Sequence, residues 1–302
     1  MVSPRLRWKL TRARERLRET FAGLFQQPPR PRVCFSCGRL VGAAEKVCSH
    51  CGASQAALSL SAFKRVALAI VPAEHAVTYI LLLANLLFFA VSVIISQRAG
   101  AQGLFDTSSE VLYLLGAKQG WAIFVQGEYW RLVMPIFLHA GVFHFAMNSF
   151  VLWQVGPQVE DLFGSARYLF LYLAPGVIGF AASAWWYHPA AISVGASGSI
   201  FGLIGILISY ISQQRGFSSE YRASLIRWAV FIIIIGIFFP FDNAAHIGGL
   251  VSGMALGRMV SARRPVTPAA RFRVNLMGWG SAAIIFWSLA MVLLNLPAAS
   301  GR

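Results

Sequence analysis

The chain of 302 residues is 57% hydrophobic and only 12% charged, whereas soluble globular proteins carry about 25% charged residues. This composition excludes a single water-soluble domain and indicates a protein that crosses the membrane several times. The 26 Lys and Arg against 11 Asp and Glu give a net charge of +15, and because the basic residues gather at the borders of apolar segments, they indicate membrane topology rather than nucleic-acid binding.

The first segment, residues 1–27, is predicted to form a basic amphipathic helix. Apolar side chains recur at three- and four-residue steps from Leu6 to Leu24, with arginines around them. Such a helix suits either the anionic cytoplasmic leaflet of the membrane or a solvated position against the module that follows. A proline-rich linker at 28–33 comes next.

Residues 34–52 carry two C-x-x-C pairs, which contain all four cysteines of the chain. Thiolates at this spacing fit one tetrahedral Zn²⁺, and the glycine after each pair permits a tight turn. The alternatives are two disulfides or four unrelated thiols, which the gathering of all four cysteines here on the reducing side of the membrane disfavours. We therefore predict a zinc ribbon in which the metal is structural rather than catalytic, and whose protein partner the sequence does not identify. Its ligands would be Cys34, Cys37, Cys48 and Cys51.

Seven later segments are apolar and long enough to cross a bilayer as helices. They are 77–96, 142–159, 168–187, 197–212, 223–240, 244–260 and 274–296. Lys and Arg are concentrated in the loops on the side of the N-terminus, so the positive-inside rule predicts a cytoplasmic N-terminus and an outer C-terminus. The second, fourth and sixth spans then all enter the membrane from the outer face.

Unusual polar residues lie near the beginnings of these three spans. His144 and Asn148 are about one helical turn apart, and alone such a pair is more often a packing hydrogen bond than a reactive group. Ser197 stands in the string Gly195-x-Ser197-Gly198 at a helix start, where its hydroxyl is exposed and its backbone N–H can face a developing oxyanion. Polar groups at membrane depth are costly, so we treat all of them as candidate functional residues.

The fourth and sixth spans are predicted to pack closely together. The fourth is short, so the non-helical segment 190–196 before it must lie at membrane depth, enclosed by protein or by a water-filled cavity. The sixth begins Ala245-His246 and carries Gly249 and Gly253 at a four-residue step, which permits close approach to a neighbouring helix. His246 is thereby predicted beside Ser197, and a serine with a neutral histidine is a nucleophile with its general base.

At this point the motifs resemble those of the rhomboid intramembrane serine proteases, over residues 72–261. They are, in chain order, Trp130-Arg131, His139, His144-x-x-x-Asn148, Glu160, Gly195-x-Ser197-Gly198 and Ala245-His246-x-x-Gly249-x-x-x-Gly253. The resemblance implies an all-α polytopic membrane protein with a rhomboid-like six-helix core. In this chain a zinc ribbon precedes that core, and an additional transmembrane helix at 274–296 follows it.

The resemblance also implies roles for individual residues. Ser197 would be the nucleophile and His246 the general base of a dyad without a catalytic carboxylate. His144, Asn148 and the backbone N–H of Ser197 would form the oxyanion hole. Residues expected to pack around the site are Phe201, whose ring would lie on the catalytic imidazole, and Gly195, Gly198 and Gly249. The fifth span would lie beside the point of substrate entry.

Other polar residues receive structural interpretations. His139 is expected to orient the first loop or the oxyanion side of the site. Glu160, Asp161 and Arg167 are expected to fix the turn between the second and third spans. Asp242 could tune the catalytic histidine, but we expect it to cap its own helix.

The sequence thus predicts an intramembrane serine endopeptidase that cleaves membrane-protein substrates in or near their transmembrane helices, in a bacterial inner membrane. One alternative is a catalytically silent rhomboid-like protein that binds transmembrane helices. Another is a membrane-tethered zinc-ribbon adaptor. The presence of both Ser197 and His246 disfavours the first alternative, and the common depth of the polar residues disfavours the second. Nucleic acid is not an expected partner.

Overall fold

The computed structural model describes residues 32–33, 39–42, 45, 47–50, 74–101, 103, 106–214, 219–263 and 265–296. The chain divides into two compact units, Met1–Ile70 and Val71–Arg302. In the first unit β1 (Arg32–Val33) pairs antiparallel with β2 (Leu40–Val41), and Cys48 is buried with Val41. The predicted helix at 1–27 and the ligands Cys34, Cys37 and Cys51 lie outside the described residues, so the zinc ribbon stays a prediction.

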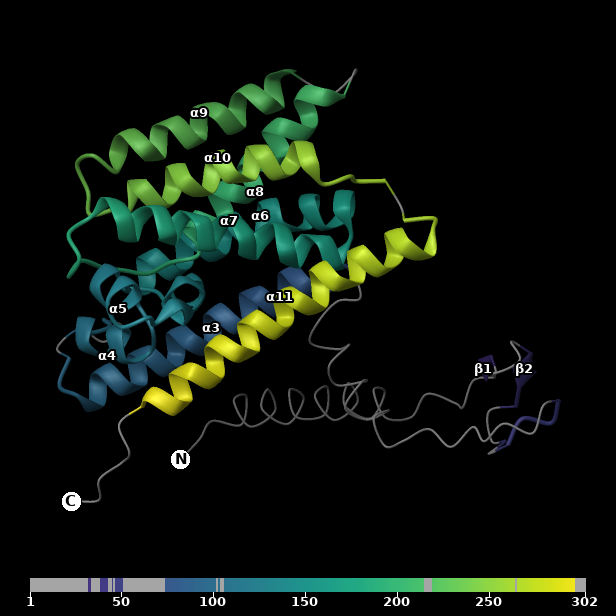
Figure 1. Ribbon diagram of the computed structural model, residues 1–302, viewed down its shortest axis with the longest axis horizontal. Coiled ribbons are helices and arrows are strands. Elements are labelled where there is room, and N and C mark those ends of the chain that lie inside the picture. Colours follow the sequence, from purple (N-terminus) through teal and green to yellow (C-terminus); the bar gives the residue numbers. More distant parts are fainter. Residues whose placement is uncertain are drawn as a thin grey trace, which may run out of the picture. The chain divides into compact units, whose positions relative to one another are not determined.

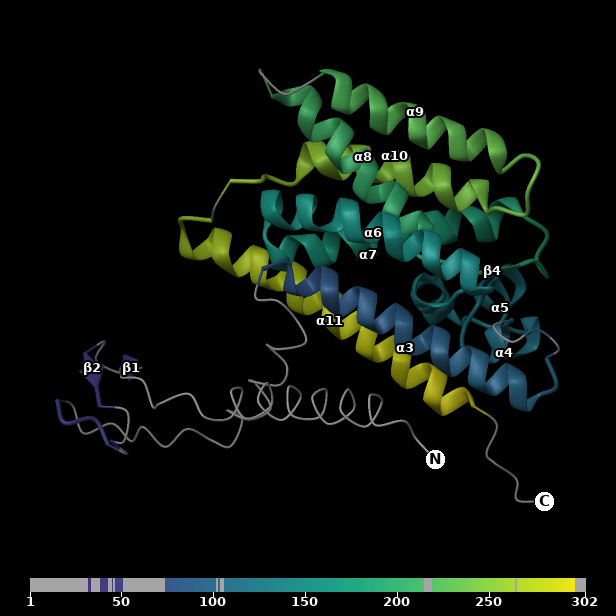
Figure 2. The ribbon, with the colours of Figure 1, turned by 180° about the vertical axis from the view of Figure 1, so that it is seen from behind.

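The second unit is a bundle of helices (Figures 1 and 2). Among the described residues its long helices are α3 (Ala76–Arg98), α6 (Val142–Phe163), α7 (Ser165–Trp186), α8 (Ser197–Gln213), α9 (Ser219–Ile235), α10 (Asn243–Met259) and α11 (Pro268–Asn295). Each corresponds to one predicted span. The fifth ends at Ile235 rather than at Pro240, because Gly236 and Pro240 both disfavour a continuing helix.

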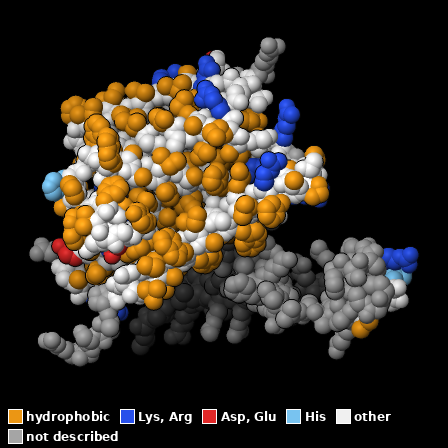
Figure 3. Space-filling model, viewed as in Figure 1, with side chains coloured by type: hydrophobic (Ala, Val, Ile, Leu, Met, Phe, Trp, Pro, Cys, Tyr) orange, Lys and Arg blue, Asp and Glu red, His pale blue; other side chains and the backbone are white. Residues whose placement is uncertain are grey.

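The helices differ in how well each could span a membrane alone. By length and composition, α3, α7 and α11 are long and apolar enough, within the described part of the chain. Helix α8 is apolar but has 17 residues, or about 26 Å at 1.5 Å per residue, which is less than a hydrocarbon core of about 30 Å. Large apolar side chains such as Phe231, Trp279 and Phe286 are exposed. Hydrophobic side chains cover much of the face that Figure 3 shows. These surfaces fit an integral membrane protein.

Helices α8 and α10 approach each other at their glycines. A Cβ atom added to Gly249 would lie 2.1 Å from the carbonyl oxygen of Gly198, and one added to Gly253 would lie 2.1 Å from that of Gly202. Neither distance is sterically possible, so only glycine allows this backbone contact. The two helices that carry Ser197 and His246 are therefore in direct contact with each other, as the glycine spacing predicted.

The first loop folds into short elements with their own core. They are α4 (Ser109–Leu114), β3 (Lys118–Gln119), α5 (Gly120–Phe124) and the 3-10 helices η1 (Tyr129–Leu132) and η2 (Met134–Phe137). Trp130, Met134 and Leu138 are buried in this core, and Val292 of α11 packs into it. Strand β3 pairs antiparallel with β4 (Ile192–Ser193), which precedes α8. The seventh helix thus supports the loop that contacts the segment before Ser197.

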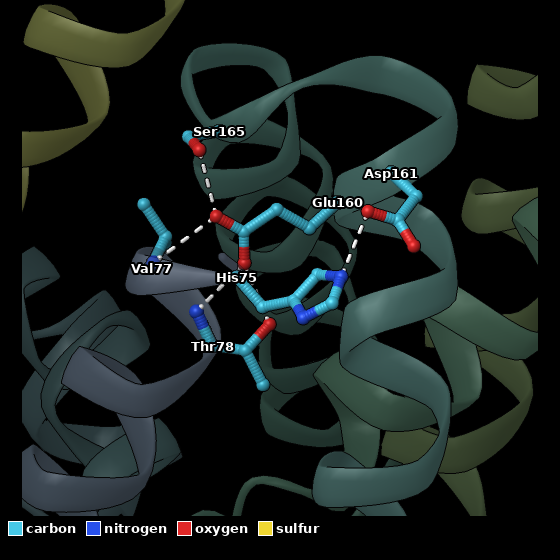
Figure 4. Close-up of polar contacts among 6 residues, drawn as sticks. All are labelled: His75, Val77, Thr78, Glu160, Asp161 and Ser165. Carbon is cyan, nitrogen blue, oxygen red and sulfur yellow. Dashed lines mark hydrogen bonds and ion pairs between the residues drawn. The ribbon is translucent and has the colours of Figure 1, made fainter. Parts of the chain in front are cut away.

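At the end of the bundle away from Ser197, Glu160 joins α6 to the starts of α3 and α7 (Figure 4). Its buried carboxylate accepts hydrogen bonds from the backbone N–H groups of Val77 and Thr78, from the Thr78 hydroxyl and from the Ser165 hydroxyl. Asp161 lies 2.7 Å from His75. The contact with Ser165 lies at the α6–α7 turn, where Glu160 was expected to act. Glu160 also satisfies the free N–H groups at the start of α3, which was not predicted.

Arg167 acts at the same end, which we call the Glu160 end. Its guanidinium donates to the carbonyl of Phe163, 3.1 Å away, and to that of Arg263, 2.8 Å away. The side chain therefore ties the α6–α7 turn, as expected, and also the segment that joins α10 to α11. We call the other end of the bundle the Ser197 end.

Candidate active site

The segment before Ser197 is extended rather than helical, and the first loop supplies partners for its backbone. The carbonyl of Pro189 accepts a hydrogen bond from the Trp121 N–H at 2.9 Å, and the Gly195 N–H donates to the carbonyl of Pro135 at 2.8 Å. Between these two contacts, β4 pairs with β3. A non-helical segment at membrane depth needs such partners, because lipid offers none.

Ser197 and His246 meet where α8 and α10 begin. Ser197 Oγ lies 2.8 Å from His246 Nε2, which is hydrogen-bonding distance between a nucleophile and a base. The Phe201 ring stacks on the imidazole, with ring centroids 4.5 Å apart and an interplanar angle of 7°. His246 is 4% exposed, and its Nδ1 has no hydrogen-bond partner among the described residues. Within the part of the chain that the structure describes, no carboxylate therefore joins the pair as a third member.

Two candidate hydrogen-bond donors of α6, His144 and Asn148, lie against the backbone of Gly195, close to this pair. Gly195 has a φ of +129°, a conformation that favours glycine. A Cβ atom there would lie 2.6 Å from His144 Nε2 and 3.4 Å from Asn148 Nδ2. Both side chains of α6 thus lie against the backbone that leads into Ser197. Asn148 Nδ2 is buried without a partner in the described part of the chain, so it is free to donate to a group that binds there.

His144, the histidine expected in the oxyanion hole, is contacted by Ala140 and His139 of the first loop. His144 Nδ1 lies 3.5 Å from the backbone N–H of Ala140, and if Nδ1 accepts there, the neutral ring carries its proton on Nε2. His139 packs edge-on against His144, with ring centroids 5.3 Å apart. Burial, together with a smaller effect of the neighbouring His144, lowers the pKa of His139 to about 3. A neutral, packed His139 fits the expected orienting role.

Asp242 caps α10. Its carboxylate accepts a hydrogen bond from the backbone N–H of Ala245 at 2.9 Å and another from the Ser183 hydroxyl of α7. The predicted capping role is confirmed, and the second contact fixes the start of α10 against α7. Because His246 follows Ala245, the cap also fixes the position of the imidazole.

Sequence reasoning missed one polar residue near the site. Lys118, in β3, is 1% exposed, and its Nζ donates to the carbonyl of Ala191 at 3.3 Å. The only sequence signal is a single lysine in an otherwise uncharged stretch of the first loop, between Glu110 and Glu128. The partner carbonyl belongs to the backbone and leaves no trace in the sequence.

Fold and site together define a class: an integral membrane protein whose described helices hold a partly buried serine–histidine pair, with polar donors, near one end of the bundle. Comparison with known proteins identifies the domain. Residues 126–263 match the family model for the rhomboid domain, so the chain contains a rhomboid domain.

Several curated proteins are similar to the chain. Rhomboid protease GluP of Bacillus subtilis (strain 168) is 42% identical over 154 residues, which are 49% of this chain and 29% of that protein. RHOMBOID-like protein 6, mitochondrial, of Arabidopsis thaliana is 39% identical over 154 residues, 50% of each chain. Putative rhomboid protease YdcA of Bacillus subtilis (strain 168) is 34% identical over 132 residues, 43% of this chain and 66% of that protein. The chain spans half or less of the first two relatives.

Proposed function

We propose that the protein is an intramembrane serine endopeptidase that hydrolyses peptide bonds in or near the transmembrane helices of other membrane proteins. The observation that carries the proposal is the 2.8 Å contact between Ser197 Oγ and His246 Nε2, with two donors of α6 beside it. The names of GluP and YdcA as rhomboid proteases support the same class of reaction.

In the proposed reaction, Ser197 Oγ attacks the substrate carbonyl carbon while His246 Nε2 takes the hydroxyl proton. The carbonyl oxygen becomes an oxyanion and accepts hydrogen bonds from the Ser197 N–H, His144 Nε2 and Asn148 Nδ2. The C–N bond then breaks, and His246 gives its proton to the leaving amine. Water, activated by the same imidazole, hydrolyses the acyl-enzyme and restores the serine.

The substrate must present an accessible carbonyl to Ser197. A transmembrane helix hides its carbonyls in internal hydrogen bonds, which lipid cannot replace. The proposed substrates are therefore single-span proteins whose helix is easily unwound near the end that meets Ser197. By the distribution of Lys and Arg, that end is the outer one, with the N-terminus in the cytoplasm of a bacterial cell and the protein in its inner membrane.

The four cysteines of the head are proposed to hold a structural Zn²⁺. Within the described residues no group of three or more His, Cys, Asp or Glu could hold a metal ion, and the proposed chemistry uses none. The basic segment 1–27 would add attraction to anionic lipids. Both features concern attachment and partners of the protein rather than bond cleavage.

The second candidate function is that of a rhomboid-like protein that binds transmembrane helices without cleaving them. It is favoured by one observation, that several relatives from Arabidopsis thaliana are named RHOMBOID-like proteins and not proteases. Cleavage of a single-span substrate in proteoliposomes distinguishes the two. We expect product from the wild type and none from Ser197→Ala or His246→Ala. A folded wild-type protein that retains but never cleaves such substrates would favour the second function.

A further inference from the structure

Lys118 places a buried ammonium group beside the candidate active site. The residue is 1% exposed, and among the described residues its Nζ donates one hydrogen bond, 3.3 Å to the carbonyl of Ala191. The same atom lies 5.6 Å from the centroid of the Tyr187 ring. A buried charge is costly unless specific partners compensate it. The burial of Lys118 therefore has to be explained by the groups that its ammonium contacts.

The Lys118 ammonium contacts the segment that leads to Ser197. Ala191 comes directly before β4, whose Ser193 pairs with Lys118 itself in the two-stranded ladder. At the far end of the segment, the Gly195 N–H bonds to the carbonyl of Pro135. Two residues later, Ser197 begins α8. The ammonium thus fixes the start of a short extended segment whose end is fixed by η2.

The carboxylate that caps α10, the helix that bears His246, contributes to the electrostatic surroundings of Lys118. Burial lowers the pKa of Lys118, and the attraction of the Asp242 carboxylate opposes that effect. Asp242 in turn accepts from the Ala245 N–H and from Ser183. The carboxylate that caps α10 therefore favours the charged form of Lys118, and the hydrogen bond of that ammonium group is made to the segment that leads to Ser197.

We propose that Lys118 is a positioning residue: its ammonium holds the Ala191 carbonyl at the start of the extended segment, and so keeps Ser197 at its reactive separation from His246. The inference rests on the proposed proteolytic function and assigns a new role within it. Lys118 touches neither member of the pair, so it acts through the segment 189–196.

A purely structural role is the competing explanation, because the main-chain ladder of β3 and β4 could hold the segment without the ammonium. Lys118→Met keeps the aliphatic stem and removes the charge, whereas Lys118→Arg keeps a charge and donors. Arg98→Met is the matched control, since Arg98 is exposed at the end of α3 and its loss also removes one positive charge.

The first test is proteolysis in proteoliposomes, with initial rates over a range of substrate concentrations. We expect Lys118→Met to lower kcat about 10- to 100-fold, the effect of a small misplacement of reacting groups, with KM within about twofold because substrate binding is untouched. Lys118→Arg should recover most of kcat, and Arg98→Met should match the wild type. A normal kcat in Lys118→Met, or equal losses in the Met and Arg variants, would overturn the inference.

The second test does not depend on cleavage. Hydrogen–deuterium exchange should rise in Lys118→Met within 189–196, while the interiors of α8 and α10 stay protected as in the wild type. Faster exchange throughout both helices, or unchanged exchange in 189–196, would contradict the positioning role. If the wild type cleaves no substrate but 189–196 responds, the proposed function fails and the placement of Lys118 stands. If the wild type cleaves and neither readout changes, the inference fails alone.

Discussion

The two ends of the helical bundle bury polar side chains in different ways. At the Glu160 end the carboxylate accepts four hydrogen bonds, from Val77, Thr78 and Ser165. At the Ser197 end, Asn148 Nδ2 and His246 Nδ1 are buried without partners among the described residues. Buried polar groups are nearly always satisfied in folded proteins. A satisfied group therefore indicates architecture, and an unsatisfied donor beside a nucleophile indicates a site prepared for a group that arrives later.

The largest expected effect on stability lies at the Glu160 end. Glu160→Ala leaves several buried donors at the start of α3 unpaired, each at a cost of about 1–3 kcal/mol. Asp161→Ala is the matched control, because Asp161 is 69% exposed and bonds only to His75 among the partners in this structure, so its loss should cost about 1 kcal/mol or less. Thermal unfolding in detergent measures both. Equal effects of the two substitutions would remove the distinction between the two ends.

At the Ser197 end the same kind of change should affect rate rather than stability. Asn148→Ala removes a donor that has no partner in the resting protein, so the unfolding temperature should hardly change. Cleavage should fall about 100- to 1,000-fold, the usual cost of one oxyanion donor. Gln154→Ala, at an exposed position of the same helix, should leave the rate unchanged. An Asn148→Ala variant that unfolds early but cleaves normally would reverse our assignment of the two ends.

The contact that joins the two catalytic helices can be tested through its glycines. A Cβ atom at Gly253 would lie 2.1 Å from the Gly202 carbonyl, whereas one at Gly280 of α11 would meet nothing within 4 Å. Gly253→Ala should destabilise the bundle by about 1–3 kcal/mol as an overpacked contact. Gly280→Ala should stabilise α11 by about 0.5–1 kcal/mol. Thermal unfolding of both variants measures these changes in stability. A Gly253→Ala variant as stable as the wild type would show that α8 and α10 are farther apart.

The smallest effect is expected from removal of the proposed zinc. A chelator should release the metal and unfold the head, because structural zinc sites couple binding to folding. Cleavage by the membrane core should stay within about twofold of its starting rate. Zinc release and initial cleavage rate can be followed in one sample. Immediate loss of cleavage on chelation would show that the head supports the site.

The sequence predicted the candidate site better than its surroundings. Ser197 and His246 could be placed together because glycine steps indicate which helices touch, and the structure has them in contact. The bond from Lys118 to Ala191 spans 73 residues and ends on a carbonyl, and that from Thr78 to Glu160 spans 82. A backbone partner has no residue type, so no pattern could indicate these contacts before the chain was folded.

The most direct test of the central claim asks whether Ser197 is a nucleophile activated by His246. The intact protein is treated with a fluorophosphonate, and the modified residue is located by mass spectrometry of its peptides. Our account predicts phosphonylation of Ser197 in the wild type and none at Ser199, two residues along the same helix, with labelling abolished by His246→Ala. Labelling that persists in His246→Ala, or that occurs elsewhere while Ser197 stays unmodified in a folded protein, would contradict the dyad.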